Sequence, residues 1–156
     1  MTMKYAVHFI VLTILIIPLA CSKLPPDGKD DHVTTRGTIE VTAQLMEIPG
    51  EFPPNNLYDY AYVLKYKVLQ VHRGKLDSDT ILVGHYNPLK PRAKVKDKRV
   101  DDVGGTLRRF QAGDTHRMAL ESSIDEFYMG GIINEYAEKE TGPVFWAVWT
   151  NPVAKK

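Results

Sequence analysis

The stretch that decides the fold runs from Tyr58 to Val71 and reads Tyr-Asp-Tyr-Ala-Tyr-Val-Leu-Lys-Tyr-Lys-Val-Leu-Gln-Val. From Tyr60 to Val68 every second side chain is apolar or aromatic, whereas Lys65 and Lys67 occupy alternate positions. A period of two is typical of a β-strand with one buried and one solvated face. The stretch therefore predicts a long strand, ended by the glycine and aspartate turn signals that follow it.

Four further segments show strand patterns bounded by turn residues. Apolar and polar residues alternate from Ile39 to Leu45, and the segment 80–86 is apolar on both faces, which indicates a central strand. The last two predicted strands span 115–120 and 144–150. Between them, Ser123 begins a capping-box pattern and 132–140 has the pattern of a second short helix. This order predicts a mostly β fold, a five-stranded antiparallel OB-like Greek-key barrel with a short helical connection before the last strand.

Aromatic side chains occupy both faces of the last predicted strand. Trp146 falls on one face, whereas Trp149 falls on the other with Phe145. One aromatic set must belong to the core, and the other is either a stacking platform for sugar rings or lies under the helical connection. Burial is the favoured interpretation because aromatic residues readily fill cores.

Composition restricts the function classes. The 156 residues are 44% hydrophobic, include 20 Lys+Arg and 19 Asp+Glu, and contain one cysteine. The chain is therefore neither disordered nor a disulfide scaffold, and one ordinary domain is expected. The net charge of +1 also argues against nucleic acid as a ligand, since a protein that coats nucleic acid carries a clear basic excess.

The first 20 residues have the layout of an export signal. Lys4 precedes an apolar run from Ala6 to Ile17, which is short for a membrane-spanning helix. The run leads into Leu19-Ala20-Cys21, which resembles the lipobox of bacterial lipoprotein precursors, although Pro18 stands where that family prefers leucine. The resemblance implies that residues 1–20 are a cleaved signal peptide and that Cys21 is lipidated, anchoring an exported protein to the membrane of the bacterial cell envelope.

The residues after the cysteine extend this interpretation. Ser22 resembles lipoproteins passed on to the periplasmic face of an outer membrane. The proline-rich and charged segment 21–36 predicts a flexible tether, and 37–153 predicts a single OB-like domain. Two alternatives stay open, in which Cys21 is a free thiol beside an ordinary cleavage site or the leader is an uncleaved anchor helix.

A second resemblance concerns the fold. The segment Tyr66 to Gly74, followed by Ile81-Leu82-Val83, resembles the aromatic–x–Val–x–x–Val–x–x–Gly strand of netrin-like and TIMP-like modules. It implies an OB-type fold. It does not imply protease inhibition, because TIMP-like inhibitors rely on disulfides and a free N-terminal cysteine, whereas the cysteine of this chain is predicted to be acylated.

The candidate binding site is the mouth formed by the long segment after the third strand. Six basic residues and one acid lie between Lys90 and Arg99, and loops that leave strand ends are common places for binding residues. Arg92 would act as a planar donor to an anion and Tyr86 as a stacking face, for an acidic glycan, a phosphate group or an acidic protein partner. Alternatively, the charges only solvate a loop. The candidate ligand-binding residues are His85, Tyr86, Lys90, Arg92, Lys94, Arg108 and Arg109.

Two histidines support a different hypothesis. His85 and His116 lie on different predicted strands and can face each other, with Asp114 nearby. Such a group would suit a metal ion or a proton relay, as in an envelope enzyme or metal-dependent hydrolase. The chain has no His-Glu-x-x-His spacing, and the alternative is a pair of hydrogen-bonded structural histidines.

The sequence thus favours a non-catalytic, lipid-anchored binding or assembly module of the cell envelope, with no cofactor assigned. Its expected partners are the membrane and an envelope protein or acidic glycan, and not nucleic acid. The envelope enzyme that uses His85 and His116 stays open. A purely structural lipoprotein, whose basic segment 90–99 pairs with the acidic segment 121–140 within the chain, also stays open.

Overall fold

The structure is a computed structural model that describes residues 24–155. The predicted signal peptide over residues 1–20 and the predicted lipidation site Cys21 lie outside the described residues. In the described part, no helix is long and apolar enough to cross a membrane.

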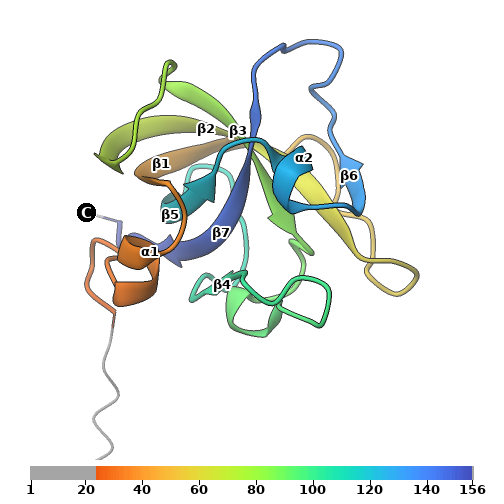
Figure 1. The fold of residues 1–156 in the computed structure, drawn as a ribbon, viewed down its shortest axis with the longest axis horizontal. Helices are drawn as coiled ribbons and strands as arrows, with labels where there is room; N and C mark the ends of the chain where they lie inside the picture. The colour runs from red at the N-terminus through yellow and green to blue at the C-terminus, as the bar shows by residue number, and fades with distance from the viewer. Residues whose placement is uncertain (1–23, 156) are drawn as a thin grey trace, which may run out of the picture.

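Five strands close into a barrel (Figure 1), namely β1 (Ile39–Glu47), β2 (Tyr60–Arg73), β3 (Thr80–Tyr86), β5 (Thr115–Glu121) and β7 (Val144–Pro152). Around the barrel the order is β1, β2, β3, β7, β5 and back to β1. Neighbouring strands are antiparallel, as expected, except that β3 and β7 run parallel. The arrangement is that of an OB-like Greek-key barrel, which confirms the predicted fold.

Alternating side chains of β1 and β2 fill the barrel interior. Bulges interrupt the β1–β2 register at three places, and bulges bend a strand and increase its twist. The bent β2 can therefore pair with β1 and also with β3. The buried interior residues of these two strands are Ile39, Val41, Ala43, Leu45, Tyr60, Tyr62, Leu64 and Tyr66.

The outer face of β3 is covered as well, which explains its uniformly apolar sequence. Gly84 lies beneath the one-turn helix α2 (Ile124–Phe127), and a Cβ at this position would lie 2.3 Å from Ile124 Cδ1. The glycine therefore permits the close approach of helix and strand. Next to it, Leu82 packs in an outer cluster with Tyr136.

The connection before β7 contains the expected short helix but differs in detail. Ser123 makes no side-chain capping hydrogen bond and has a φ of 65°, so the predicted capping box is wrong. The second predicted helix, over 132–140, is also wrong, because β6 (Gly131–Ile133) pairs in parallel with the start of β2. Ile132 packs against the outer clusters and Ile133 against the barrel core, so the segment has the two faces of a strand.

The tryptophans of β7 are covered from outside the barrel. Trp146 is fully buried and stacks on Tyr128 in the connection after α2, with ring centroids 5.1 Å apart. Trp149 stacks on His32 of the N-terminal segment at 4.5 Å. Phe145 belongs to the core cluster. Phe145 is therefore core, and Trp146 on the opposite face lies under the helical connection rather than on an open platform. Trp149, which the sequence groups with Phe145, lies instead under the N-terminal segment.

The segment 24–36 packs against the barrel, although we expected a flexible tether over 21–36. Helix α1 (Asp31–Thr35) is capped by Asp30, whose carboxylate accepts a hydrogen bond of 2.9 Å from Val33 N. Val33 is fully buried, and Asp27 forms an ion pair of 3.0 Å with Arg117 on β5. Two acids of this segment are thus partners of polar groups on the barrel, since Asp30 also accepts hydrogen bonds from Trp149 and Asn151 of β7.

A buried ion-pair network lies below this segment. Glu40 of β1, expected on the wet face of its strand, is 4% exposed and binds Arg117 at 2.7 Å. Arg73 lies 3.6 Å from the same carboxylate and donates hydrogen bonds to the carbonyls of Thr34 and Arg36. These contacts join the N-terminal segment to β1 and β2, so the folded domain begins earlier than the predicted residue 37.

Candidate functional site

The long segment after β3, residues 87–113, is called the basic insertion. Its start is fixed by Asn87, a buried residue whose side chain forms several hydrogen bonds. The Asn87 amide oxygen accepts hydrogen bonds from Tyr60 N at 3.2 Å and Asn55 Nδ2 at 2.7 Å, and its nitrogen donates to Asp59 at 2.7 Å. Lys90 forms an ion pair of 3.3 Å with the same Asp59 carboxylate. With a φ of 42°, Asn87 occupies the left-handed region, which asparagine tolerates better than most residues. The insertion thus leaves the barrel in one defined direction.

Arg92 holds the next turn of the insertion, η1 (Arg92–Lys94), against the barrel. Its guanidinium donates hydrogen bonds to the carbonyls of Tyr86 at 2.7 Å, Asn87 at 2.6 Å and Lys90 at 2.9 Å. The guanidinium carbon also lies 5.3 Å from the centre of the Phe110 ring. Burial lowers the pKa of Arg92 to about 10, which leaves the side chain charged at neutral pH. The sequence predicted a donor to an external anion, but the backbone uses these donors, so Arg92 is a positioning residue.

Tyr86 holds the middle of the basic insertion in place, and its ring has no open face on which a ligand could stack. Its ring is buried against Tyr128, and its hydroxyl donates a hydrogen bond of 2.6 Å to Asp97 Oδ2. The other oxygen of Asp97 accepts hydrogen bonds from the backbone N–H groups of Arg99 and Val100. The single acid in the basic run therefore stabilises the turn that carries its neighbours.

Six side chains of the insertion, called the six exposed cations, project into solvent. None of them forms an ion pair among residues 24–155. Arg92 N donates to Leu107 O at 2.9 Å, which places the second part of the insertion beside η1. The six exposed cations are Lys94, Lys96, Lys98, Arg99, Arg108 and Arg109.

The predicted binding residues thus fall into two groups. Lys94, Arg108 and Arg109 are exposed on the insertion, and Lys90 is partly buried in its ion pair. His85, Tyr86 and Arg92 are buried and do not face an external ligand. The structure adds Lys96, Lys98 and Arg99 to the exposed group, and the charge run already contained the signal for all three.

His85 and His116 face each other inside the barrel, with the Tyr66 hydroxyl between them. This hydroxyl lies 3.1 Å from His85 Nε2 and 3.2 Å from His116 Nδ1, and the three side chains are fully buried. Burial lowers the pKa of His116 to about 4. Burial and the charges of Arg92 and His116 also lower the pKa of His85. Both imidazoles are therefore neutral at neutral pH.

This pair matches hydrogen-bonded structural histidines better than a metal centre. Asp114, the expected third member, instead forms an ion pair of 2.9 Å with Lys155. Within the described residues, no group of three or more His, Cys, Asp or Glu side chains is placed to hold a metal ion. Because both histidines are fully buried, a substrate cannot reach them in this structure. The geometry therefore does not support the enzyme hypothesis at this pair.

The basic segment 90–99 and the acidic segment 121–140 do not pair with each other in the described part of the chain. Glu140 binds Lys65 of β2 at 2.5 Å, whereas Lys90 binds Asp59. The internal pairing expected for a purely structural lipoprotein is thus not observed, and the six exposed cations are available to a partner.

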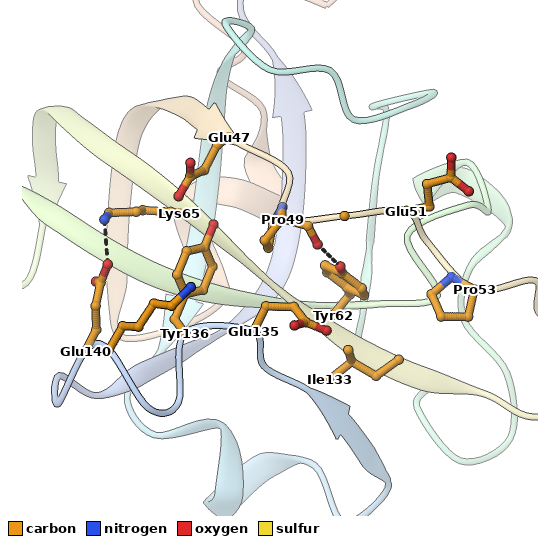
Figure 2. Close-up of a pocket in the computed structure, with 12 residues that line it drawn as sticks. Glu47, Pro49, Glu51, Pro53, Tyr62, Lys65, Ile133, Glu135, Tyr136 and Glu140 are labelled. Atoms are coloured by element: carbon orange, nitrogen blue, oxygen red, sulfur yellow. Dashed lines mark hydrogen bonds and ion pairs between the residues drawn. The ribbon is translucent and has the colours of Figure 1, made fainter.

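A second polar site, which we call the acidic pocket, lies outside the residues expected from the sequence. It is a cavity of about 540 Å³ between the loop after β1, the middle of β2 and the turn after β6 (Figure 2). The lining residues come from 47–65 and from 133–140, two parts of the chain that are far apart in the sequence, so no local sequence pattern indicates the pocket. Its charged lining residues are Glu47, Glu51, Lys65, Glu135, Lys139 and Glu140.

Comparison with protein-family models, with curated proteins and with solved structures finds no match for this chain. The OB-like assignment therefore stands on the strand order and register alone.

Proposed function

We propose that this protein is a non-catalytic binding or assembly module of the bacterial cell envelope, lipid-anchored at Cys21, which contacts an acidic partner through the six exposed cations. The partner class is an acidic glycan, a phosphate group or an acidic protein face. The single observation that carries the proposal is that these cations have no ion-pair partner in the described part of the chain, although they stand on a firmly held loop.

The rigid support of the loop favours binding over mere solvation. Arg92 and Asn87 fix the start of the insertion, and the Tyr86–Asp97 hydrogen bond fixes its middle. A loop that is already ordered loses less conformational entropy when a ligand binds.

The position of the insertion also agrees with an anchored protein. Arg36, which follows α1, donates a hydrogen bond of 2.6 Å to the carbonyl of Asp102 in the insertion. Within the same insertion, β4 (Gly104–Gly105) pairs with β7 beside Trp149, on which His32 of α1 stacks. Figure 1 shows α1 and β4 in the same lower part of the molecule. Residues 102–105 of the basic insertion therefore lie beside the N-terminal segment that contains α1.

Retention on two anionic probes tests the binding part of the proposal. The purified protein is applied to immobilised heparin, as an acidic glycan, and to vesicles that contain phosphatidylglycerol, as a source of phosphate groups. We expect the triple variant Lys94→Ala/Lys96→Ala/Lys98→Ala to bind at least one probe about a hundredfold more weakly, because each cation near an anionic surface contributes about 1 kcal/mol and three contribute about 3 kcal/mol.

The matched control is Lys29→Ala/Lys67→Ala/Lys75→Ala, which removes the same charge from exposed lysines outside the insertion. Equal weakening in both triple variants would mean that net charge alone causes retention and would contradict the proposal.

The anchor is tested separately in cells. Labelled palmitate should enter the wild-type protein and should not enter Cys21→Ser. Equal labelling of the two proteins would remove the lipid anchor from the proposal and leave the binding surface to its own test.

A further inference from the structure

Large apolar and aromatic side chains gather on one part of the barrel surface. Within residues 24–155, eight such side chains are exposed, and five of them lie around the start of β2. Met129 is 95% exposed and Leu57 is 83% exposed. Single exposed apolar side chains are common on soluble proteins, but a group of them marks an interaction surface. We call this group the apolar patch, and its members are Leu57, Tyr58, Leu89, Phe127 and Met129.

Contacts between three segments bring the apolar patch together. β6 pairs in parallel with the start of β2, which places the residues just before β6 near the loop that leads into β2 (Figure 1). The carboxylate of Asp59 in this loop accepts a hydrogen bond from Asn87 and forms an ion pair with Lys90, and Leu89 lies between these two residues in the chain. The apolar patch is thus built from segments that the fold holds beside one another.

A cavity of about 440 Å³ opens within the apolar patch. Two buried rings that line it, Tyr86 and Tyr128, lie 5.6 Å apart between their centroids. Phe127 and Met129 also line the cavity and are exposed, so they stand at its edge. Because Tyr128 also stacks on Trp146, the floor of the cavity is already formed before a ligand binds. The volume lies within the range of about 300–1,000 Å³ that is usual for ligand sites.

The cavity also has one unpaired charge. Its charged lining residues are Asp59 and Arg99, and Asp59 is neutralised by its ion pair with Lys90. Arg99 is exposed and forms no ion pair in the described part of the chain. Asp125 and Glu126 of α2 are exposed nearby in the chain but do not line the cavity. A guanidinium binds a carboxylate through two parallel hydrogen bonds, so the cavity favours an apolar group with an acid beside it.

The position of the apolar patch favours a protein over a lipid bilayer as the partner. Tyr128 stacks on Trp146 near the start of β7, whereas Asp30, at the beginning of α1, binds Asn151 near the end of β7. The five residues of strand between these two contacts span about 17 Å. Figure 1 shows α1 at the lower left and β6 at the right. A bilayer held by the proposed anchor at Cys21 would therefore meet the α1 end of the barrel first.

We propose that the apolar patch binds a protein segment in which an apolar side chain has acidic neighbours. The apolar side chain occupies the cavity between Phe127 and Met129, and one of the acids binds Arg99. This inference rests on the proposed function, because Arg99 is one of the six exposed cations, and it names an acidic protein as their partner.

Titration of the purified full-length protein with a defined peptide tests the proposal, followed by nuclear magnetic resonance signals of Met129 and Tyr128. The probe is the pentapeptide Glu-Asp-Leu-Asp-Glu with both ends blocked, and the controls are the same peptide with serine in place of leucine and the basic peptide Lys-Lys-Leu-Lys-Lys. We expect the leucine peptide with acidic neighbours to bind at least about tenfold more tightly than either control, because only this peptide supplies both the apolar and the acidic group.

Equal binding of the leucine and serine peptides would overturn the inference and would leave the proposed function to its own test with the lysine triple variant. Absence of binding at about 10 mM would also overturn it, since a ligand with a millimolar dissociation constant saturates its site at this concentration.

Variants locate the site. Met129→Ser and Phe127→Ser should each weaken binding of the leucine peptide about fivefold, and Arg99→Gln should weaken it about tenfold, the usual effect of losing a charge-assisted hydrogen bond. The matched control is Leu69→Ser, which changes an exposed apolar residue of β2 outside the apolar patch. The inference is overturned if Leu69→Ser weakens binding as much as Met129→Ser, or if Arg99→Gln has no effect.

The same variants separate a protein partner from a bilayer. Met129→Ser should bind vesicles that contain phosphatidylglycerol as well as the wild-type protein does. A loss of vesicle binding in Met129→Ser as large as its loss of peptide binding would assign the apolar patch to the bilayer and would overturn the inference.

Discussion

Acidification should destabilise the barrel through its buried histidines, and His116 gives the clearest case. Burial lowers the pKa of His116 from 6.5 to about 4 in the folded chain. At pH 7 the imidazole is neutral in the folded and unfolded states and has no linkage effect. Between pH 6.5 and 4 the unfolded chain binds a proton that the folded chain does not, so the free energy of unfolding falls as the pH falls. Each pKa unit corresponds to about 1.4 kcal/mol, so His116 alone accounts for a loss of about 3 kcal/mol by pH 4.

The assay is urea unfolding of the purified protein at pH 7 and at pH 4.5. Because carboxylates also titrate in this range, the informative quantity is the difference between wild type and His116→Gln, which removes the imidazole but keeps a hydrogen-bonding group near Tyr66. Between the two pH values we expect wild type to lose about 2.5 kcal/mol more than the variant. Equal losses for wild type and His116→Gln would refute the argument, as would an imidazole resonance of His116 that titrates near pH 6.5 in the folded protein.

Two further substitutions test the packing that supports the site. Arg92→Ala should lower the free energy of unfolding by about 3 kcal/mol, because it leaves buried backbone carbonyls without donors, and unchanged urea unfolding would contradict the positioning role. Gly105→Ala should lower stability by about 3 kcal/mol, because φ is 127° and the new Cβ would lie 2.0 Å from the carbonyl oxygen of Thr150. By comparison, Gly131→Ala has open space around the new Cβ and should change stability by less than about 1 kcal/mol, and similar melting temperatures for the two alanine variants would show that the close approach is wrong.

The barrel strands were predictable because their signals are local. The alternation of apolar and polar residues along β1 and β2 depends only on which face of each strand is buried. The uniformly apolar sequence of β3 indicates a central strand because α2 and its neighbours cover the outer face of β3. The five strand positions and the helical connection together indicate the OB-like order. The bulges in β1–β2 and the parallel pairing of β6 depend on distant partners, and the sequence carries no local sign of them.

The candidate site was predictable in its charge but not in its geometry. A run of lysines and arginines marks a basic surface, yet nothing in the run distinguishes Arg92, which turns inward to the backbone, from Lys94, which stays in solvent. The expectation of a flexible tether over 21–36 is wrong for the same reason. Asp27 is paired because Arg117 lies beside it in the folded chain, and the local sequence does not show this. Ion pairs between residues far apart in the chain decide such cases.

We propose that the six exposed cations contact an acidic component of the envelope. The most direct test is photo-crosslinking in living cells that make the full chain, with a benzophenone amino acid at Ala93, which is exposed within η1 and carries no charge. The matched control places the same group at Gln70, an exposed residue of β2 outside the insertion. We expect a discrete crosslinked species from position 93 that is absent from position 70 and is lost when Lys94, Lys96 and Lys98 are alanine. No crosslink from position 93, or the same crosslinks from both positions, would contradict it.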